Sequence, residues 1–206
     1  MTYAIVGSGA IGGALAQRFS SKGIPVSIAN RRGPDSLADL ARKLGPSVSA
    51  SSLQAALRAD VVILALPFDA VRDALADAAK WNGRIVVDAT NAIDFPAFTP
   101  RDLGVRPSSE IVAEAAPGAR LVKAFNTLLA AVLASDPAQG GGRRVVFVSG
   151  NEPAANADVA ALVERLGFKA VQLGKLTDGG RLQQFGAALV GLNLVALDDP
   201  GRPAAQ

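Results

Sequence analysis

The sequence predicts an α/β protein with a doubly wound, mostly parallel sheet and a small C-terminal lobe. Strand patterns and helix patterns alternate along the chain, as in right-handed crossover connections between parallel strands. Residues 61–66 form a continuous apolar run, which is typical of a central strand that helices cover on both faces. We expect a main domain over residues 1–150, an extension over 151–198 packed on it, and a disordered tail over 199–206.

The individual elements follow from local signals. Pro34 and Gly45 mark the start and the end of one helix, and Ser108 or Ser109 is expected to cap another. Residues 92–107 are rich in proline and lack periodicity, which predicts a long functional or mobile loop, and residues 135–142 form another loop. The expected strands are 3–6, 25–29, 47–50, 61–66, 84–88, 120–124, 144–149 and 169–173; the expected helices are 13–20, 34–44, 52–58, 70–80, 108–115, one ending near 134, 152–166 and a final apolar helix over 182–197.

Composition excludes several functional classes. The chain has 21 Lys and Arg residues against 18 Asp and Glu residues, spread along its length, so no nucleic-acid partner is expected. It has no Cys and no His, which excludes disulfides, thiol nucleophiles, Ser-His-Asp triads and the commonest metal sites. Met1 leads directly into the first strand without a signal peptide, and the longest apolar run is too short and too polar to cross a bilayer. We therefore expect a soluble, cytoplasmic protein with no metal and no membrane partner.

The most specific motif lies near the start of the chain. The strand Tyr3–Val6 is followed by G-x-G-x-x-G and a helix, and a second strand comes about twenty residues later. Gly7 allows the tight turn, Gly9 lets the backbone approach a pyrophosphate, and Gly12 allows the helix to pack closely on the strand. The helix N-terminus offers free N–H groups to phosphates. We therefore expect a Rossmann dinucleotide site along Gly7, Ser8, Gly9, Ala10, Ile11 and Gly12.

The end of the second strand indicates which dinucleotide binds. An NAD site usually has a carboxylate here for the ribose hydroxyls, whereas an NADP site has an arginine for the 2′-phosphate. This chain has Asn30 followed by Arg31 and Arg32, with no carboxylate before Asp35. A guanidinium can bind a phosphate through two hydrogen bonds or stack on the adenine. NADP(H) is therefore the expected cofactor, with two solvated arginines as the alternative interpretation.

Further site residues are expected where other parallel strands end, because ligands of doubly wound sheets bind beyond the carboxyl ends of the strands. Thr90, Asn91 and Asn126 are short polar residues that could bond the nicotinamide ribose and carboxamide, or could simply stabilise turns. The full expected set at these strand ends is Leu66, Pro67, Phe68, Ala89, Thr90, Asn91, Ala124, Phe125 and Asn126.

Several further residues have alternative interpretations. Phe68, Phe125 and Phe185 could wall a flat ring or could be ordinary core residues. Lys123 is the one candidate for a direct catalytic role, with a purely positional role as the alternative. Asp88 is expected to act as a cap or loop anchor.

Taken together, these motifs resemble the deazaflavin-dependent NADP oxidoreductases, the NADPH:coenzyme F420 reductase family. The similar segments are I-V-G-S-G-A-I-G at 5–12, A-N-R-R-G-P at 29–34, V-I-L-A-L-P at 62–67, V-D-A-T-N at 87–91, V-K-A-F-N-T at 122–127 and G-G-R-L-Q-Q-F-G-A-A-L at 179–189. The resemblance implies a Rossmann domain with a small C-terminal lobe, NADP bound along the first motif, and a deazaflavin in an adjacent cleft. Related domains pass hydride to ordinary flavins, so FMN and FAD remain alternative acceptors.

Three functions remain open on this basis. Hydride transfer between a nicotinamide and a flavin-like ring needs proximity and stacking more than a proton relay, which suits a chain without His or Cys. The leading hypothesis is therefore an NADPH-dependent reductase of a deazaflavin or flavin, with the ring in a cleft between residues 92–107 and 177–180. The alternatives are a reductase of a small imine or keto acid and a non-catalytic NADP(H) sensor. The apolar final helix predicts a homodimer.

Overall fold

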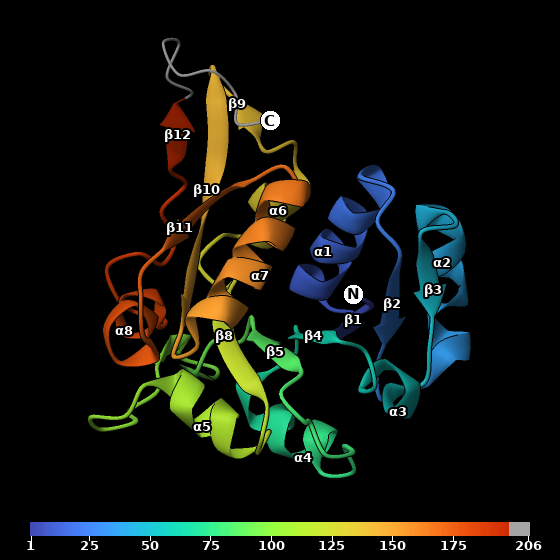
Figure 1. The fold of residues 1–206 in the computed structure, drawn as a ribbon, viewed down its shortest axis with the longest axis horizontal. Helices are drawn as coiled ribbons and strands as arrows, with labels where there is room; N and C mark the ends of the chain where they lie inside the picture. Colours follow the sequence, from blue (N-terminus) through green and yellow to red (C-terminus); the bar gives the residue numbers. More distant parts are fainter. Residues whose placement is uncertain (198–206) are drawn as a thin grey trace.

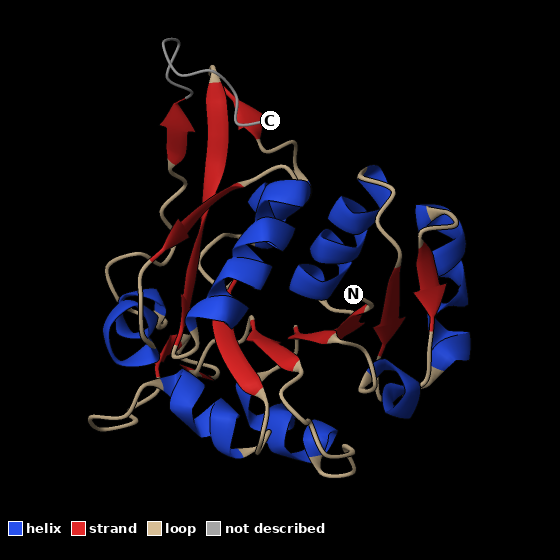
Figure 2. Ribbon diagram, in the orientation of Figure 1, coloured by secondary structure: helices blue, strands red, loops and turns tan. Residues whose placement is uncertain are grey.

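The computed structural model describes residues 1–197, and the expected disordered tail over 199–206 lies outside them. One sheet runs through the molecule with helices on both of its faces (Figures 1 and 2). Its main strands pair in parallel except that β10 runs antiparallel to β8, and two short outer strands also pair antiparallel with β10, which confirms the mostly parallel α/β fold. In spatial order they are β11 (Lys169–Gln172), β10 (Gly142–Gly150), β8 (Arg120–Ala124), β5 (Ile85–Asp88), β4 (Val61–Leu64), β1 (Tyr3–Val6), β2 (Val26–Ala29) and β3 (Val48–Ala50).

The core lies in two layers, one on each face of the sheet. Alternate residues of each strand point to opposite faces, so Ile63 packs in one layer while Val62 and Leu64 pack in the other. Helices α1 (Ala10–Ser21), α2 (Ala38–Leu44), α6 (Ala130–Ala134) and α7 (Pro153–Arg165) lie on the first face. Helices α3 (Leu53–Ala56), α4 (Val71–Leu75) and α5 (Ser108–Glu114) lie on the second. The apolar run in β4 is buried on both faces, as expected of a central parallel strand.

Several predicted boundaries change. The helix expected over 70–80 continues only to Leu75, and a 3₁₀ turn, Pro34–Leu37, precedes α2. Neither Ser108 nor Ser109 caps α5, because its N-cap is Pro107 without a side-chain hydrogen bond, so that prediction was wrong. The long loop contains a small hairpin of β6 (Ile93–Asp94) and β7 (Thr99–Pro100). The glycine-rich loop contains β9 (Ala138–Gln139), which pairs with β10.

The final apolar helix over 182–197 does not form. The chain makes one helical turn, α8 (Arg181–Gln183), then irregular turns, and ends in β12 (Val195–Leu197). Gly186 and Gly191 adopt positive φ angles of 86° and 81°, which interrupt a helix. β12 pairs instead with the outer end of β10, which extends beyond the rest of the sheet (Figure 1). Long-range strand pairing therefore overrides the local apolar pattern, and residues 184–197 are called the C-terminal segment below.

Candidate functional site

The glycine-rich turn has the geometry that the motif predicts. Gly7 has a φ of 114°, and a Cβ on it would lie 2.0 Å from the carbonyl oxygen of Ala65 in the neighbouring strand. A Cβ on Gly12 would lie 1.9 Å from the Gly7 carbonyl oxygen, so helix α1 can approach the turn only with glycine there. Gly9, in contrast, has an ordinary φ and open space around its missing Cβ. Two of the glycines therefore serve packing, whereas the third borders free space.

The N-terminus of α1 borders the same space. Its N-cap is Gly9, which has no side chain to accept from the first N–H groups of the helix, and its first turn contains no acidic residue. The helix is 12 residues long, so its N-terminal N–H groups carry a positive dipole end. Within residues 1–197, neither a capping side chain nor a carboxylate in the first turn of α1 therefore competes with an anion at this position. The arrangement suits a bound pyrophosphate.

Asn30 joins the glycine-rich turn to the arginine turn. Its side-chain Nδ2 donates to Ser8 Oγ at 3.0 Å. Its Oδ1 accepts from the backbone N–H of Arg32 at 2.9 Å and from Ser36 Oγ at 3.1 Å. The Asn30 side chain therefore holds the two turns together. Ser36 was not found by sequence reasoning, because no motif places a serine four residues beyond the arginine pair.

A cavity of about 250 Å³ lies between these two turns. Both Arg31 and Arg32 line it and are exposed, and within residues 1–197 neither guanidinium makes an ion pair or a hydrogen bond. The other walls are mostly apolar, which suits a purine ring. They include the expected residues Leu66 and Pro67, and the complete lining is Val6, Gly7, Ser8, Asn30, Arg31, Arg32, Leu53, Leu66, Pro67, Ala70 and Ala74.

At the ends of β5 and β8, two asparagines bond each other. Asn126 Nδ2 donates to Asn91 Oδ1 at 2.9 Å, and Asn91 Nδ2 donates to the Asn126 carbonyl oxygen at 2.9 Å. Phe125 is buried and immediately precedes Asn126. Its φ is 65°, an uncommon value for a non-glycine residue. Asn126 Oδ1 is buried and has no hydrogen-bond partner among the described residues. Ala89 and Ala124 are buried core residues beside this pair.

A fully buried ion pair lies below the asparagines. Lys123 Nζ donates to Asp88 Oδ2 at 3.0 Å, and neither side chain is exposed to solvent. Asp88 also accepts from Ser109 Oγ and from the hydroxyl and backbone N–H of Thr90, at 2.7–2.9 Å. Burial by itself raises the pKa of Asp88, but the Lys123 ammonium and these hydrogen bonds outweigh it and hold the pKa below its usual range.

This ion pair assigns structural positions to three expected residues. Asp88 anchors the loop after β5, as expected. Lys123 is buried in the pair, which suits the positional alternative, and the Thr90 hydroxyl donates to Asp88. Ser109 also belongs to this cluster. The sequence offered no signal for it beyond helix capping, because its partner is 21 residues away.

Gln183, the last residue of α8, bonds the same strand ends and so fixes the start of the C-terminal segment there. Sequence reasoning did not identify this residue. Gln183 is fully buried, and its Nε2 donates to the carbonyl oxygens of Lys123 and Phe147 at 3.3 and 3.2 Å. Its Oε1 accepts from Ser149 Oγ at 2.5 Å, and its own carbonyl accepts from Asn126 Nδ2 at 2.6 Å. Gln183 thus joins β8, β10 and the asparagine pair to α8.

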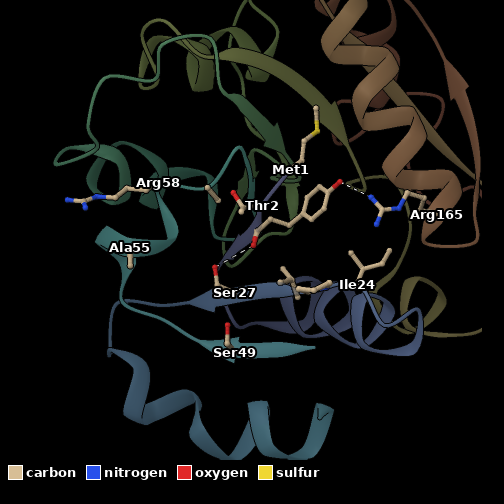
Figure 3. Close-up of a pocket in the computed structure, with 12 residues that line it drawn as sticks. Met1, Thr2, Ile24, Ser27, Ser49, Ala55, Arg58 and Arg165 are labelled. Atoms are coloured by element: carbon tan, nitrogen blue, oxygen red, sulfur yellow. Dashed lines mark hydrogen bonds between the residues drawn. The ribbon is translucent and has the colours of Figure 1, made fainter. Parts of the chain in front are cut away.

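A larger cavity of about 600 Å³ opens at the opposite, amino-terminal end of the strands (Figure 3). It arises because α3 is a single turn and leaves the Ser27 and Ser49 side of β2 and β3 partly uncovered. Tyr3 lies at its edge, with its hydroxyl accepting from Arg165 at 3.0 Å. Neither the glycine-rich turn nor a strand carboxyl end borders this cavity, so it lacks the features of a dinucleotide site.

Two kinds of feature are absent from the described residues 1–197. No helix there is long and apolar enough to cross a membrane. No group of three or more His, Cys, Asp or Glu side chains in the same range could hold a metal ion.

Comparison with known proteins identifies similar chains. Residues 2–92 match the family described as NADP oxidoreductase coenzyme F420-dependent. A hypothetical protein from Sinorhizobium meliloti is 58% identical, with a TM-score of 0.93 over 95% of this chain and 96% of that one. A protein from Arthrobacter sp. FB24 that carries the provisional description of F420-dependent NADP reductase is 28% identical, with a TM-score of 0.73 and 86% of each chain covered.

More distant structures share the fold. A reductive aminase from Aspergillus terreus is 22% identical with a TM-score of 0.62, over 87% of this chain but 56% of that protein. This chain therefore spans a little over half of the length of the aminase.

Proposed function

The chain belongs to the family of coenzyme F420-dependent NADP oxidoreductases, and on that premise we propose that it transfers hydride between NADPH and a deazaflavin or flavin. The observation that carries the proposal is the open, anion-compatible space between Gly9, the N-terminus of α1 and the Arg31–Arg32 turn. It lies at the carboxyl ends of parallel strands, where ligands of such sheets bind.

The residues present fit NADP(H). The glycine-rich turn and the first N–H groups of α1 would bind the pyrophosphate. The apolar part of the 250 Å³ cavity would hold the adenine, and Arg31 and Arg32 would bind the 2′-phosphate. Because neither guanidinium has a partner among residues 1–197, binding phosphate breaks no existing ion pair.

The asparagine pair fits the nicotinamide end of the cofactor. Buried polar atoms in proteins are nearly always hydrogen-bonded, and Asn126 Oδ1 is an exception among the described residues. A carboxamide N–H would satisfy it. Asn91 and Gln183 hold the Asn126 side chain from two sides, so this acceptor is already oriented before a ligand binds.

When bound, NADPH supplies a hydride, which carries both electrons of the reduction. The task of the chain is then to bring two rings into contact and to exclude water between them. Asp88 and Lys123 are fully buried and bonded to each other, so we assign neither of them as a proton donor to the acceptor ring. The proton that completes a reduced flavin or deazaflavin ring therefore comes from solvent.

The test is rapid mixing of the protein and NADPH with separate acceptors: a deazaflavin, FMN, FAD and a cyclic imine. We expect reduction of a tricyclic ring, with a primary isotope effect when the transferred hydrogen of NADPH is replaced by deuterium. Imine reduction without ring reduction would support the imine or keto acid alternative. Tight NADPH binding without reduction of any acceptor would replace the proposal with the sensor alternative.

A further inference from the structure

Three phenylalanines form an exposed aromatic cluster. Phe95 is 72% exposed and Phe98 is 60% exposed, whereas Phe185 is half-buried. The ring centroids of Phe95 and Phe98 are 5.9 Å apart, and those of Phe98 and Phe185 are 5.3 Å apart with an edge-to-face angle of 81°. A contiguous exposed apolar patch often marks a binding surface.

One side of the cluster is fixed to the end of β4. Phe95 and Phe98 belong to the hairpin that follows β5, and Arg101 at the base of that hairpin donates from Nε to Asp94 at 2.7 Å. Two other nitrogens of Arg101 bond the Asp69 carboxylate, and its guanidinium lies 5.9 Å from the Phe68 ring. The hairpin is therefore held against Phe68, one of the residues expected at the strand ends and a candidate to wall a flat ring.

The other side of the cluster is fixed to the ends of β8 and β10. Phe185 follows Gln183 by two residues, and the Gln183 carbonyl accepts from Asn126. Gln184 Oε1 accepts from the backbone N–H of Ser108 at 2.9 Å, at the start of α5. Both supports of the cluster thus lead to strand ends around the asparagine pair. In Figure 1, α8 lies beside the loop that carries the hairpin.

The backbone holds the two segments in close contact. Gly186 has a φ of 86°, and a Cβ on it would lie 2.3 Å from Pro100 Cγ, so only glycine allows this approach. Phe98 has a φ of 55°, an uncommon conformation for a non-glycine residue, which is kept only where surrounding contacts impose it. Such outliers often occur at ligand sites. The position of the Phe98 ring against Phe185 is therefore imposed by the structure.

We propose that Phe95, Phe98 and Phe185 form the platform on which the planar ring of the hydride acceptor binds. The proposal rests on the proposed function and adds a location and a mode of recognition. Flat heteroaromatic rings stack on aromatic side chains through their faces, without hydrogen-bond readout. Because Phe185 follows Gln183, which bonds Asn126, a ring on this platform would lie on the nicotinamide side of the site, and exposure of Phe95 leaves room for a polar tail in solvent.

The size of the cluster favours a small ligand over a second protein chain. A phenylalanine side chain contributes roughly 150–250 Å² when fully buried, so three partly exposed rings offer on the order of 300 Å². A stable protein interface needs about 800 Å² from each partner. A tricyclic ring is covered well by the smaller area.

The test measures binding of riboflavin and of 5-deazariboflavin, whose fluorescence is quenched when the ring stacks on aromatic side chains. NADP⁺ is kept saturating, and wild type is compared with Phe98→Ser, Phe98→Leu and Phe95→Ser. Leu197→Ser is the matched control, because Leu197 is 73% exposed but lies in β12, outside the cluster. We expect at least tenfold weaker ring binding for Phe98→Ser and Phe98→Leu, a several-fold loss for Phe95→Ser and no change for Leu197→Ser. NADPH affinity should be unchanged in all four variants.

Several outcomes would overturn the platform. Wild-type protein that binds neither ring, or folded Phe98 variants that bind both rings as tightly as wild type, would each do so. A change in oligomeric mass in the Phe98 variants would assign the cluster to an interface between copies. Leucine is closer to phenylalanine in volume than serine is. If Phe98→Ser does not fold, Phe98→Leu therefore still tests whether the aromatic ring is needed. If wild type reduces a ring and the Phe98 variants keep their KM for it, the proposed function stands and the platform fails.

Discussion

Replacing Lys123 with methionine should destabilise the fold strongly, because it leaves a buried carboxylate without its counterion. Lys123 Nζ lies 3.0 Å from Asp88 Oδ2, and both side chains are fully buried. Removing one partner of such a pair costs about 3–5 kcal/mol. The hydrogen bonds from Thr90 and Ser109 to Asp88 remain, so we expect a loss near the lower end of that range. Urea unfolding can be followed through the fluorescence of the single tryptophan, the buried Trp81.

The pH dependence of this variant gives a sharper test. In wild type the pKa of Asp88 is depressed, so its contribution to stability is present above the unfolded value of about 3.9 and is lost as pH falls through the lower folded pKa. Without Lys123, burial dominates and should raise the folded pKa. The folded variant then binds more protons than the unfolded chain, so its stability should rise as pH falls from neutral toward the ordinary range of a carboxyl.

The double variant Asp88→Asn/Lys123→Met is the control, because it removes the buried charge as well as its partner. It should be more stable at neutral pH than Lys123→Met alone. The reasoning would be refuted if Lys123→Met lost less than about 1 kcal/mol, a loss within the range of an ordinary hydrogen bond. It would also fail if the loss were the same at every pH or if the double variant were no more stable than the single one.

Three further predictions concern the cofactor site and assembly. Gly12→Ala should disrupt the fold, since its Cβ would lie 1.9 Å from a carbonyl oxygen, and circular dichroism can check this. Gly9→Ala should stay folded but bind NADPH about tenfold or more weakly, as fluorescence titration can check. Arg31→Ala/Arg32→Ala should melt like wild type and lose preference for NADPH over NADH by about a hundredfold, since each hydrogen bond to a charged group contributes about 1.5–3 kcal/mol; equal dissociation constants in wild type would contradict this. The C-terminal segment exposes several leucines even though it is not a helix, so a homodimer remains our prediction, and a monomeric mass by light scattering across a wide concentration range would exclude it.

The sequence by itself determined the elements that depend on neighbouring residues. Gly7, Gly9 and Gly12 indicate a dinucleotide turn because the strand, the turn and the helix of this motif follow one another directly along the chain. The apolar run in β4 indicates a central strand for the same reason. Asn30 and the following arginines could be assigned to the cofactor site because they directly follow the second strand of the same motif.

Only the tertiary structure decided which distant residues meet. Lys123 and Asp88 are 35 residues apart, and Gln183 bonds a carbonyl 60 residues away. The 182–197 segment has the composition of an apolar helix, but its pairing with β10 and the positive φ angles of its glycines impose turns and a strand. Periodicity reports only which face of a segment is apolar, whereas strand pairing and buried hydrogen bonds depend on partners that folding brings together. The nucleotide end of the site was therefore accessible from sequence, whereas the supports of the asparagine pair and the Phe98–Phe185 contact were not.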